Sequence, residues 1–260
     1  MNHGQNNQGL AVELISPGTI IILIIVSCLY LFLIRMKNQN ERFPTKKIVS
    51  FFLSMMVLYI SMGPLNALGH SYLFSAHMLQ QSLLFFVFPL FLLVGLPDWF
   101  YSTLLKNRIV RYFLMGINPF LMALVFNTLL SFYHFPVVFD FLMSTSWGML
   151  LHGILTILIL QIWIAILPPT KELARLPELQ RMAVLILNGL LLYPACAVII
   201  FAGSPMYATY EHAEQLSAFL GPIDDQQLGG VIMKFVQEGA LAYALARLVS
   251  AWRKRELVED

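Results

Sequence analysis

The sequence predicts an all-α integral membrane protein with seven transmembrane helices, its amino terminus outside the cell membrane and its carboxyl terminus in the cytoplasm. Three observations support this fold class: the composition, the long apolar stretches, and the placement of the basic residues. Of the 260 residues, 58% are hydrophobic and 12% are charged, and the mean hydropathy is +0.74. Soluble domains carry about 25% charged residues. We therefore expect most of this chain to lie in lipid.

Seven stretches are long and apolar enough to cross a bilayer. A transmembrane helix needs about 20 mainly apolar residues, because its backbone polar groups must be hydrogen-bonded within the segment. The expected spans are Pro17 to Ile34, Ile48 to Leu68, Leu73 to Leu96, Ile117 to Pro136, Ser146 to Leu167, Ala183 to Ala202, and Gln227 to Ser250. We expect one transmembrane domain over residues 1–260, with an outer tail (1–16) that is not a cleaved signal peptide and a cytoplasmic tail (251–260).

The basic residues set the orientation, since Lys and Arg are retained on the cytoplasmic side during insertion. All but one of the 16 Lys and Arg residues fall in the first, third and fifth loops, at the end of the last span, or in the tail after it. The amino-terminal segment and the second, fourth and sixth loops contain none. Only seven spans with the amino terminus outside satisfy this alternation. The net charge of +2 gives no indication of a nucleic-acid partner.

The histidines all fall on the predicted outer side of the membrane. Imidazole is the commonest side-chain metal ligand, and together with methionine thioether it suits Cu(I). Polar side chains within spans are rare and are functional candidates by default, although a hydrogen bond between helices is an equal alternative for each histidine. The six are His3 in the tail, His70 in the second loop, His77, His134 and His152 near the outer ends of spans three to five, and His212 in the sixth loop.

The spacing around His77 permits a metal site. His70 precedes it by seven residues and Gln81 follows it by four, so both would share its face if one helix contained all three. We therefore regard His77, His134 and His152 as the main candidate ligands, and His70, Met78 and Gln81 as weaker ones. The chain has no HExxH motif, which excludes the zinc-protease arrangement, and no CxxC motif.

One basic residue, Lys234, departs from the cytoplasmic pattern and lies about two turns into the last span. Glu238 follows four residues later on the same helical face. Because either charge alone would be costly to bury, we expect an ion pair that faces the interior of the bundle. The pair could fix the orientation of the last helix or take part directly in function.

Three sequence blocks resemble the CtaG-type assembly factors of bacterial cytochrome c oxidases. The similarity extends over roughly residues 48–252. The blocks are FSAHMLQQ (74–81), which runs on to Pro89 and GLP (95–97); YHFP (133–136), followed by His152 and Trp163; and DQQLGGVIM (225–233) before the last span.

Three positions depart from the pattern of that family. Gln81 stands where the family commonly has a second histidine, Tyr133 where it often has tryptophan, and Leu151 where it often has an acidic residue. A chelate from two histidines one turn apart is therefore not expected here. A metal site would instead join His77, His134 and His152 across helices.

The resemblance implies a role in building the copper centres of a haem-copper oxidase, by presenting copper at the outer face of a bacterial cell membrane. The implied partners are oxidase subunits or other copper chaperones, and a homo-oligomer is left open. Copper is the metal that the resemblance suggests. Imidazole also suits zinc, iron and haem, so the residues alone leave the metal undecided.

Three other functions are alternatives to copper handling. A metal-free structural chaperone or scaffold for oxidase subunits would use the histidines only as hydrogen-bonding groups. A retinal photoreceptor would use Lys234, but the third span has no acidic residue to serve as counter-ion. An enzyme is the least expected, because no catalytic serine, cysteine or paired-carboxylate arrangement stands out.

Overall fold

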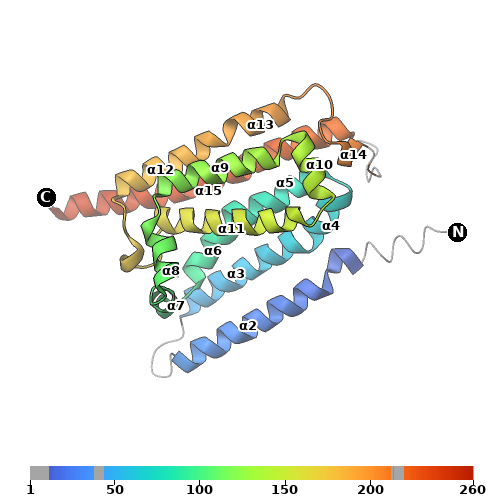
Figure 1. The fold of residues 1–260 in the computed structure, drawn as a ribbon. Helices are drawn as coiled ribbons and strands as arrows, with labels where there is room; N and C mark the ends of the chain where they lie inside the picture. Colours follow the sequence, from blue (N-terminus) through green and yellow to red (C-terminus); the bar gives the residue numbers. More distant parts are fainter. Residues whose placement is uncertain (1–11, 38–43, 212, 214–219, 260) are drawn as a thin grey trace.

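The computed structural model describes residues 12–37, 44–211, 213 and 220–259, with side chains up to residue 254. Every secondary-structure element of these residues is a helix, which confirms the all-α fold class. Most of the helices run side by side in one bundle (Figure 1). The elements are α2 (Pro17–Lys37), α3 (Thr45–Met62), α4 (Pro64–Ser71), α5 (Phe74–Ser82), the π-helical η1 (Leu83–Val87), α6 (Phe88–Gly95), α7 (Asp98–Leu104), α8 (Arg108–Arg111), the π-helical η2 (Tyr112–Gly116), α9 (Pro119–Tyr133), α10 (Pro136–Met143), α11 (Trp147–Ile166), the 3-10 helix η3 (Lys171–Leu173), α12 (Glu178–Leu191), α13 (Tyr193–Ile200), α14 (Ala208–Glu211) and α15 (Pro222–Glu259).

Several of these helices are long and apolar enough to cross a membrane. Within the described residues there are five, or six if one sharply bent pair is a single span. The five are Val12–Lys37, Thr45–Ser71, Phe74–Gly95, Trp147–Ile166 and Glu178–Ile200, and the pair is Arg108–Gly116 with Pro119–Tyr133, bent by 86°. The chain is therefore a helical protein with several candidate membrane spans. The long helix α15 is not among them, since polar residues interrupt its apolar stretch.

The fourth span expected from Ile117 to Pro136 is shorter in the structure. The Asn118 side chain accepts a hydrogen bond from the Phe120 N–H (2.9 Å), so α9 begins at Pro119. At its other end, Pro136 disfavours a helical conformation at the residue before it, and α9 ends at Tyr133. The boundary is set by two prolines and a cap rather than by hydropathy.

The outward faces of the helices are apolar, as expected for a surface that contacts lipid. On α2, Ile21, Ile22 and Ile25 each expose more than half of their side-chain surface. Soluble monomers rarely expose contiguous apolar surface of this extent. The structure therefore agrees with a multi-pass membrane protein.

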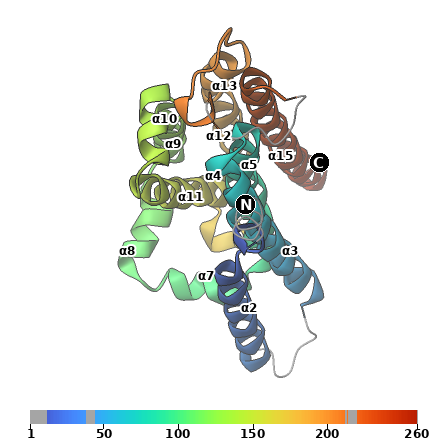
Figure 2. The same cartoon turned by 90° about the vertical axis from the view of Figure 1, so that its right-hand side faces the viewer.

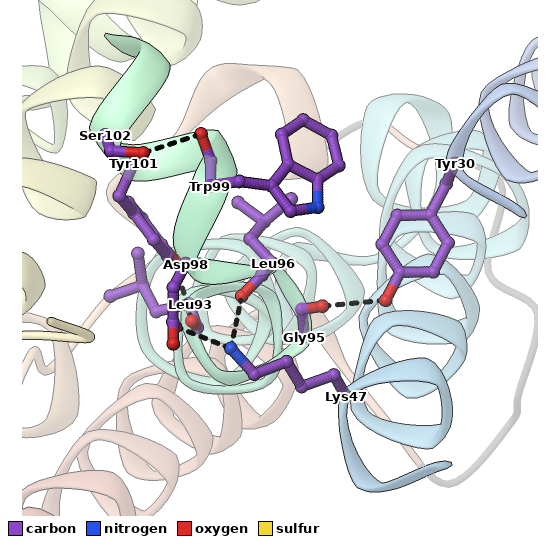
Figure 3. Close-up of polar contacts among 9 residues, drawn as sticks. All are labelled: Tyr30, Lys47, Leu93, Gly95, Leu96, Asp98, Trp99, Tyr101 and Ser102. Atoms are coloured by element: carbon purple, nitrogen blue, oxygen red, sulfur yellow. Dashed lines mark hydrogen bonds and ion pairs between the residues drawn. The ribbon is translucent and has the colours of Figure 1, made fainter. Parts of the chain in front are cut away.

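The end of α6 is fastened to α2 and α3 at one end of the bundle (Figure 3). The Tyr30 hydroxyl donates to the Gly95 carbonyl (2.8 Å), and the Lys47 ammonium lies 2.6 Å from an Asp98 carboxylate oxygen. A Cβ at Gly95 would lie only 2.6 Å from the Phe51 backbone nitrogen. Glycine is therefore required at this position for α3 and α6 to approach so closely.

Helix α7, which follows the end of α6, is also hydrogen-bonded to α6. The Tyr101 hydroxyl on α7 donates to the Leu93 carbonyl (2.7 Å). Burial, and to a smaller extent the nearby Asp98, raises the pKa of Tyr101, so its hydroxyl stays protonated and remains a donor. The block at residues 95–97 thus forms a fixed corner between α6 and α7.

Candidate functional site

Helix α5 lies near the centre of the bundle, with α9 and α11 to one side and α15 to the other (Figure 2). Every residue of α5 except Leu79 is buried, although the helix carries two glutamines, two serines and a histidine. His77 is 2% exposed and Gln81 is fully buried. Buried polar groups need hydrogen-bond partners, so the surroundings of α5 define the candidate site.

The beginning of α5 is capped by a residue from the last helix. The two Asp225 carboxylate oxygens accept hydrogen bonds from the backbone N–H groups of Phe74 (2.6 Å) and Ser75 (3.2 Å). These N–H groups have no partner within their own helix, and a negative charge at a helix amino terminus is favourable. Asp225 therefore fixes the position of the helix that carries His77 and Gln81.

The two glycines after Asp225 allow α15 to approach its neighbours. A Cβ at Gly229 would lie 2.7 Å from a Phe74 ring atom and 3.0 Å from Met78 on α5. A Cβ at Gly230 would lie 2.7 Å from the Ile200 side chain on α13. The sequence block at residues 225–233 is therefore a packing and capping element that holds α5 in place.

Two imidazoles meet on one side chain at the centre of the site. The Gln81 amide nitrogen lies 3.0 Å from His77 Nε2 and 2.7 Å from His152 Nε2, and the two rings are 5.7 Å apart. In this arrangement the amide donates to both ring nitrogens, which therefore carry lone pairs directed at the same point. The structure thus brings together two of the three predicted histidines, from α5 and α11.

Tyr133 contacts both of these imidazoles. Its ring stacks on His77 (centroids 5.8 Å apart) and on His152 (5.2 Å), and its hydroxyl lies 3.2 Å from His77 Nε2. The same hydroxyl lies 3.9 Å from the Met143 sulfur, and its single hydrogen is donated to one of these two atoms at a time. Sequence reasoning did not place Tyr133 in the site. The available signal was its position immediately before His134 in the YHFP block.

His134 has an unpaired ring nitrogen. Its Nδ1 donates to the Leu130 carbonyl (2.8 Å), and a carbonyl can only accept, so Nε2 of the neutral ring carries a lone pair. That Nε2 is buried and has no hydrogen-bond partner among the described residues. The ring packs beside Tyr133, with centroids 5.1 Å apart. His134 therefore presents an unpaired lone pair, and its ring lies against Tyr133 rather than against the other two histidines.

The site as it stands holds fewer charged or imidazole ligands than a preformed metal centre. Across the described ranges, no three His, Cys, Asp or Glu side chains are grouped closely enough to hold a metal ion. Two imidazoles with a nearby thioether still suit a soft ion such as Cu(I). The donor set is therefore compatible with copper if the Gln81 side chain moves aside.

The other candidates lie elsewhere. His70 is exposed near the end of α4 and lines a separate pocket with Met62 and Glu13. The chain is not helical between Ser71 and Phe74, so one helix does not contain both residues and the condition for a face shared by His70 and His77 is not met. Met78 is fully buried against Phe74 and α15. His3 and His212 lie outside the described residues.

An aromatic layer separates the histidines from the nearest end of the bundle. Phe139 packs edge-on against His77 (5.2 Å), and Tyr207 stacks on Phe74 (4.5 Å). The Tyr207 hydroxyl donates to the His134 carbonyl (3.0 Å). Burial raises the pKa of Tyr207 and of its neighbour Tyr210, so both hydroxyls stay protonated. This layer covers the imidazole site on that side.

The opposite side of the site is fixed by a proline. Pro89 has no N–H group, so it leaves the Phe85 carbonyl without its helical partner. The Trp163 indole N–H donates to that carbonyl (2.9 Å), and the Phe85 ring packs against His152 (6.2 Å). The interaction joins η1 to α11, the helix that carries His152.

The ion pair in the last helix is separate from this site. The Lys234 ammonium lies 2.6 Å from a Glu238 carboxylate oxygen, and the two side chains are 13% and 47% exposed, respectively. Only the lysine faces the interior. The prediction that the whole pair points into the bundle is therefore wrong for Glu238.

The fold and the site define a helical membrane protein in which two imidazoles are held together in the core. The chain matches the cytochrome c oxidase caa3 assembly factor family (Caa3_CtaG) over residues 28–255. This match covers most of the chain, so the protein belongs to that family, and the family assignment from the three sequence blocks is confirmed. No curated protein and no solved structure shows significant similarity to the chain.

Proposed function

We propose that this protein binds copper at the outer face of the cell membrane and passes it to a caa3-type cytochrome c oxidase while the copper centres of that enzyme are assembled. Membership of the assembly-factor family supports the oxidase as the enzyme that receives the copper. The role is non-enzymatic, with copper as cargo. The proposed topology has seven spans, with the amino terminus outside and the carboxyl terminus in the cytoplasm.

One observation carries the copper proposal. The Nε2 atoms of His77 and His152 both lie within hydrogen-bonding distance of the Gln81 amide nitrogen. Rotation of the Gln81 side chain leaves two lone pairs facing one point, and Cu(I) accepts a low coordination number with soft or imidazole donors. The unpaired Nε2 of His134, whose ring lies against Tyr133, supplies a further ligand atom. Gln81 thus closes the site without copper and opens it for loading.

The distribution of charge along the bundle supports the outer location. The basic helix α8 and its neighbour α7 lie at one end of the bundle, whereas α4, α10 and α14 lie at the other (Figure 1). Lys and Arg mark the cytoplasmic side. His77 follows the start of α5, and His152 the start of α11, so the histidines belong to the outer half. With α9 and α15 as additional spans, the total is seven.

The test is the copper content of the purified full-length protein after loading with Cu(I). We expect His77→Ala and His152→Ala to lose most of the bound copper, because each removes one of the two converging nitrogens. His70→Ala is the matched control, since this exposed histidine lies outside the cluster. Equal copper content in all four proteins, each shown to be folded by its melting temperature, would refute the proposal.

A metal-free scaffold for oxidase subunits is the second candidate, and the Gln81 bridge also favours it. If the role of the bridge is to join α5 to α11, the histidines need no metal. The two functions differ in a strain that lacks the protein. Excess copper in the medium should restore oxidase activity if copper delivery is the lost step, and should fail to do so if a scaffold is lost.

A further inference from the structure

The Glu238 carboxylate lies near the middle of the longest helix. In an α-helix each residue advances about 1.5 Å, so Glu238 is about 24 Å from Pro222 and about 22 Å from Arg253 along the axis. In the proposed topology these two residues mark the outer and cytoplasmic ends of α15. Glu238 therefore lies near the centre of the bilayer, where an ionisable group facing lipid is costly.

The Lys234 ammonium already has several hydrogen-bond partners inside the protein. Besides Glu238, its ammonium donates to the Gln237 side-chain oxygen (2.9 Å) and the Gly189 carbonyl (3.3 Å), and it lies 3.4 Å from the centre of the Tyr193 ring. The Gly189 carbonyl is available because α12 ends two residues later, shortly before Pro194. Lys234 thus ties α15 to α12 and α13, whereas Glu238 remains 47% exposed.

The surface beside Glu238 has room for another helix. Phe235, one turn earlier, is 80% exposed. A Cβ at Gly239 would meet no atom of the described residues within 4 Å. In membranes, helices associate through close packing at small residues and through hydrogen bonds between polar side chains. This face offers both beside a carboxylate that its partners Lys234 and Tyr193 leave 47% exposed.

We propose that this face of α15, formed by Phe235, Glu238 and Gly239, binds a transmembrane helix of an oxidase subunit. That helix places a hydrogen-bond donor, such as a hydroxyl, amide or basic side chain, on Glu238. A second copy of this chain is the competing occupant, and the crosslinking test below distinguishes it from an oxidase subunit. The inference rests on the family assignment and the proposed topology, and it is independent of copper.

The first test is site-specific photo-crosslinking in membranes. The full chain carries p-benzoylphenylalanine at position 235 and is co-expressed with epitope-tagged caa3 oxidase subunits. Position 25 on α2 is the matched control, since Ile25 is 60% exposed on a different helix. We expect a crosslink to a membrane subunit from position 235 and not from position 25. Equal yields at the two positions, or a crosslink only to a second copy of this chain, would overturn the proposal.

The second test exchanges the charges. The double variant Lys234→Glu with Glu238→Lys retains an ion pair four residues apart but presents an ammonium group outward. If the outward carboxylate is recognised, the crosslink from position 235 should fall about tenfold, the size of one interhelical hydrogen bond. An unchanged crosslink would mean that the pair is only structural. Should the exchanged protein fail to fold, Glu238→Leu replaces it, because leucine removes both acceptor oxygens; the expected loss and the refuting result are the same.

Copper content distinguishes this inference from the proposed function. Neither residue of the pair contacts the histidine site, so both variants should bind as much Cu(I) as the wild type. Loss of the crosslink with copper retained supports the docking surface. Retention of the crosslink in the exchanged protein refutes it and leaves the copper proposal unaffected.

Discussion

Replacing Asp225 by alanine tests whether the last helix positions the histidine site. The substitution leaves the buried N–H groups of Phe74 and Ser75 without acceptors. Each unsatisfied buried group costs about 1–3 kcal/mol, and loss of an N-cap costs about 0.5–2 kcal/mol, so we expect a loss of about 2–4 kcal/mol. For a chain of this size that corresponds to a melting temperature lower by about 4–16 °C.

The assay is thermal unfolding of the purified protein in one detergent, followed by intrinsic fluorescence. Asp224→Ala is the matched control, because the neighbouring carboxylate is exposed and is not part of the cap. Asp225→Asn retains one acceptor oxygen and should fall between the alanine variant and the wild type. If Asp225→Ala melts within about 1 °C of the wild type, or if Asp224→Ala loses as much stability, the capping argument is wrong.

Two further predictions use the same unfolding assay. Trp163→Phe removes the donor to the Phe85 carbonyl and leaves that group unsatisfied, which should cost about 1–3 kcal/mol; a wild-type melting temperature would mean that the carbonyl finds another partner. Gly95→Ala places a Cβ 2.6 Å from the Phe51 nitrogen and should cost about 1–3 kcal/mol, whereas Gly153→Ala, which meets nothing within 4 Å among the described residues, should be neutral or slightly stabilising. Equal effects at the two glycines would contradict the close approach of α3 and α6.

Hydropathy predicted the long helices well because lipid exposure demands an uninterrupted apolar stretch. The span expected from Ser146 to Leu167 is the helix Trp147–Ile166. Hydropathy failed where local chemistry sets the boundary, as in α9, since a cap and two prolines act independently of polarity. It also missed the division of the third span by the π-helical segment before Pro89.

The sequence indicated which residues belong to the candidate site better than it indicated how they are arranged. The four-residue spacing of His77 and Gln81 correctly indicated a shared face, since both belong to α5. Which side chain of α9 would face them depends on how the helices cross, so Tyr133 was missed and His134 was assumed to converge. Asp225 could not be connected with α5 from spacing, because the two segments meet only through the packing of α15.

The contacts around the histidines explain why the three sequence blocks include residues that cannot bind metal. Asp225 sets the position of α5, and Gly229 allows α15 to lie against it. Trp163 joins α11 to the carbonyl that Pro89 leaves free, which holds His152 opposite His77. A metal site formed across helices requires each helix to be fixed separately, because a shift of about 1 Å in one of them would separate the two nitrogens. The anchoring residues are therefore as necessary for the proposed copper site as the imidazoles.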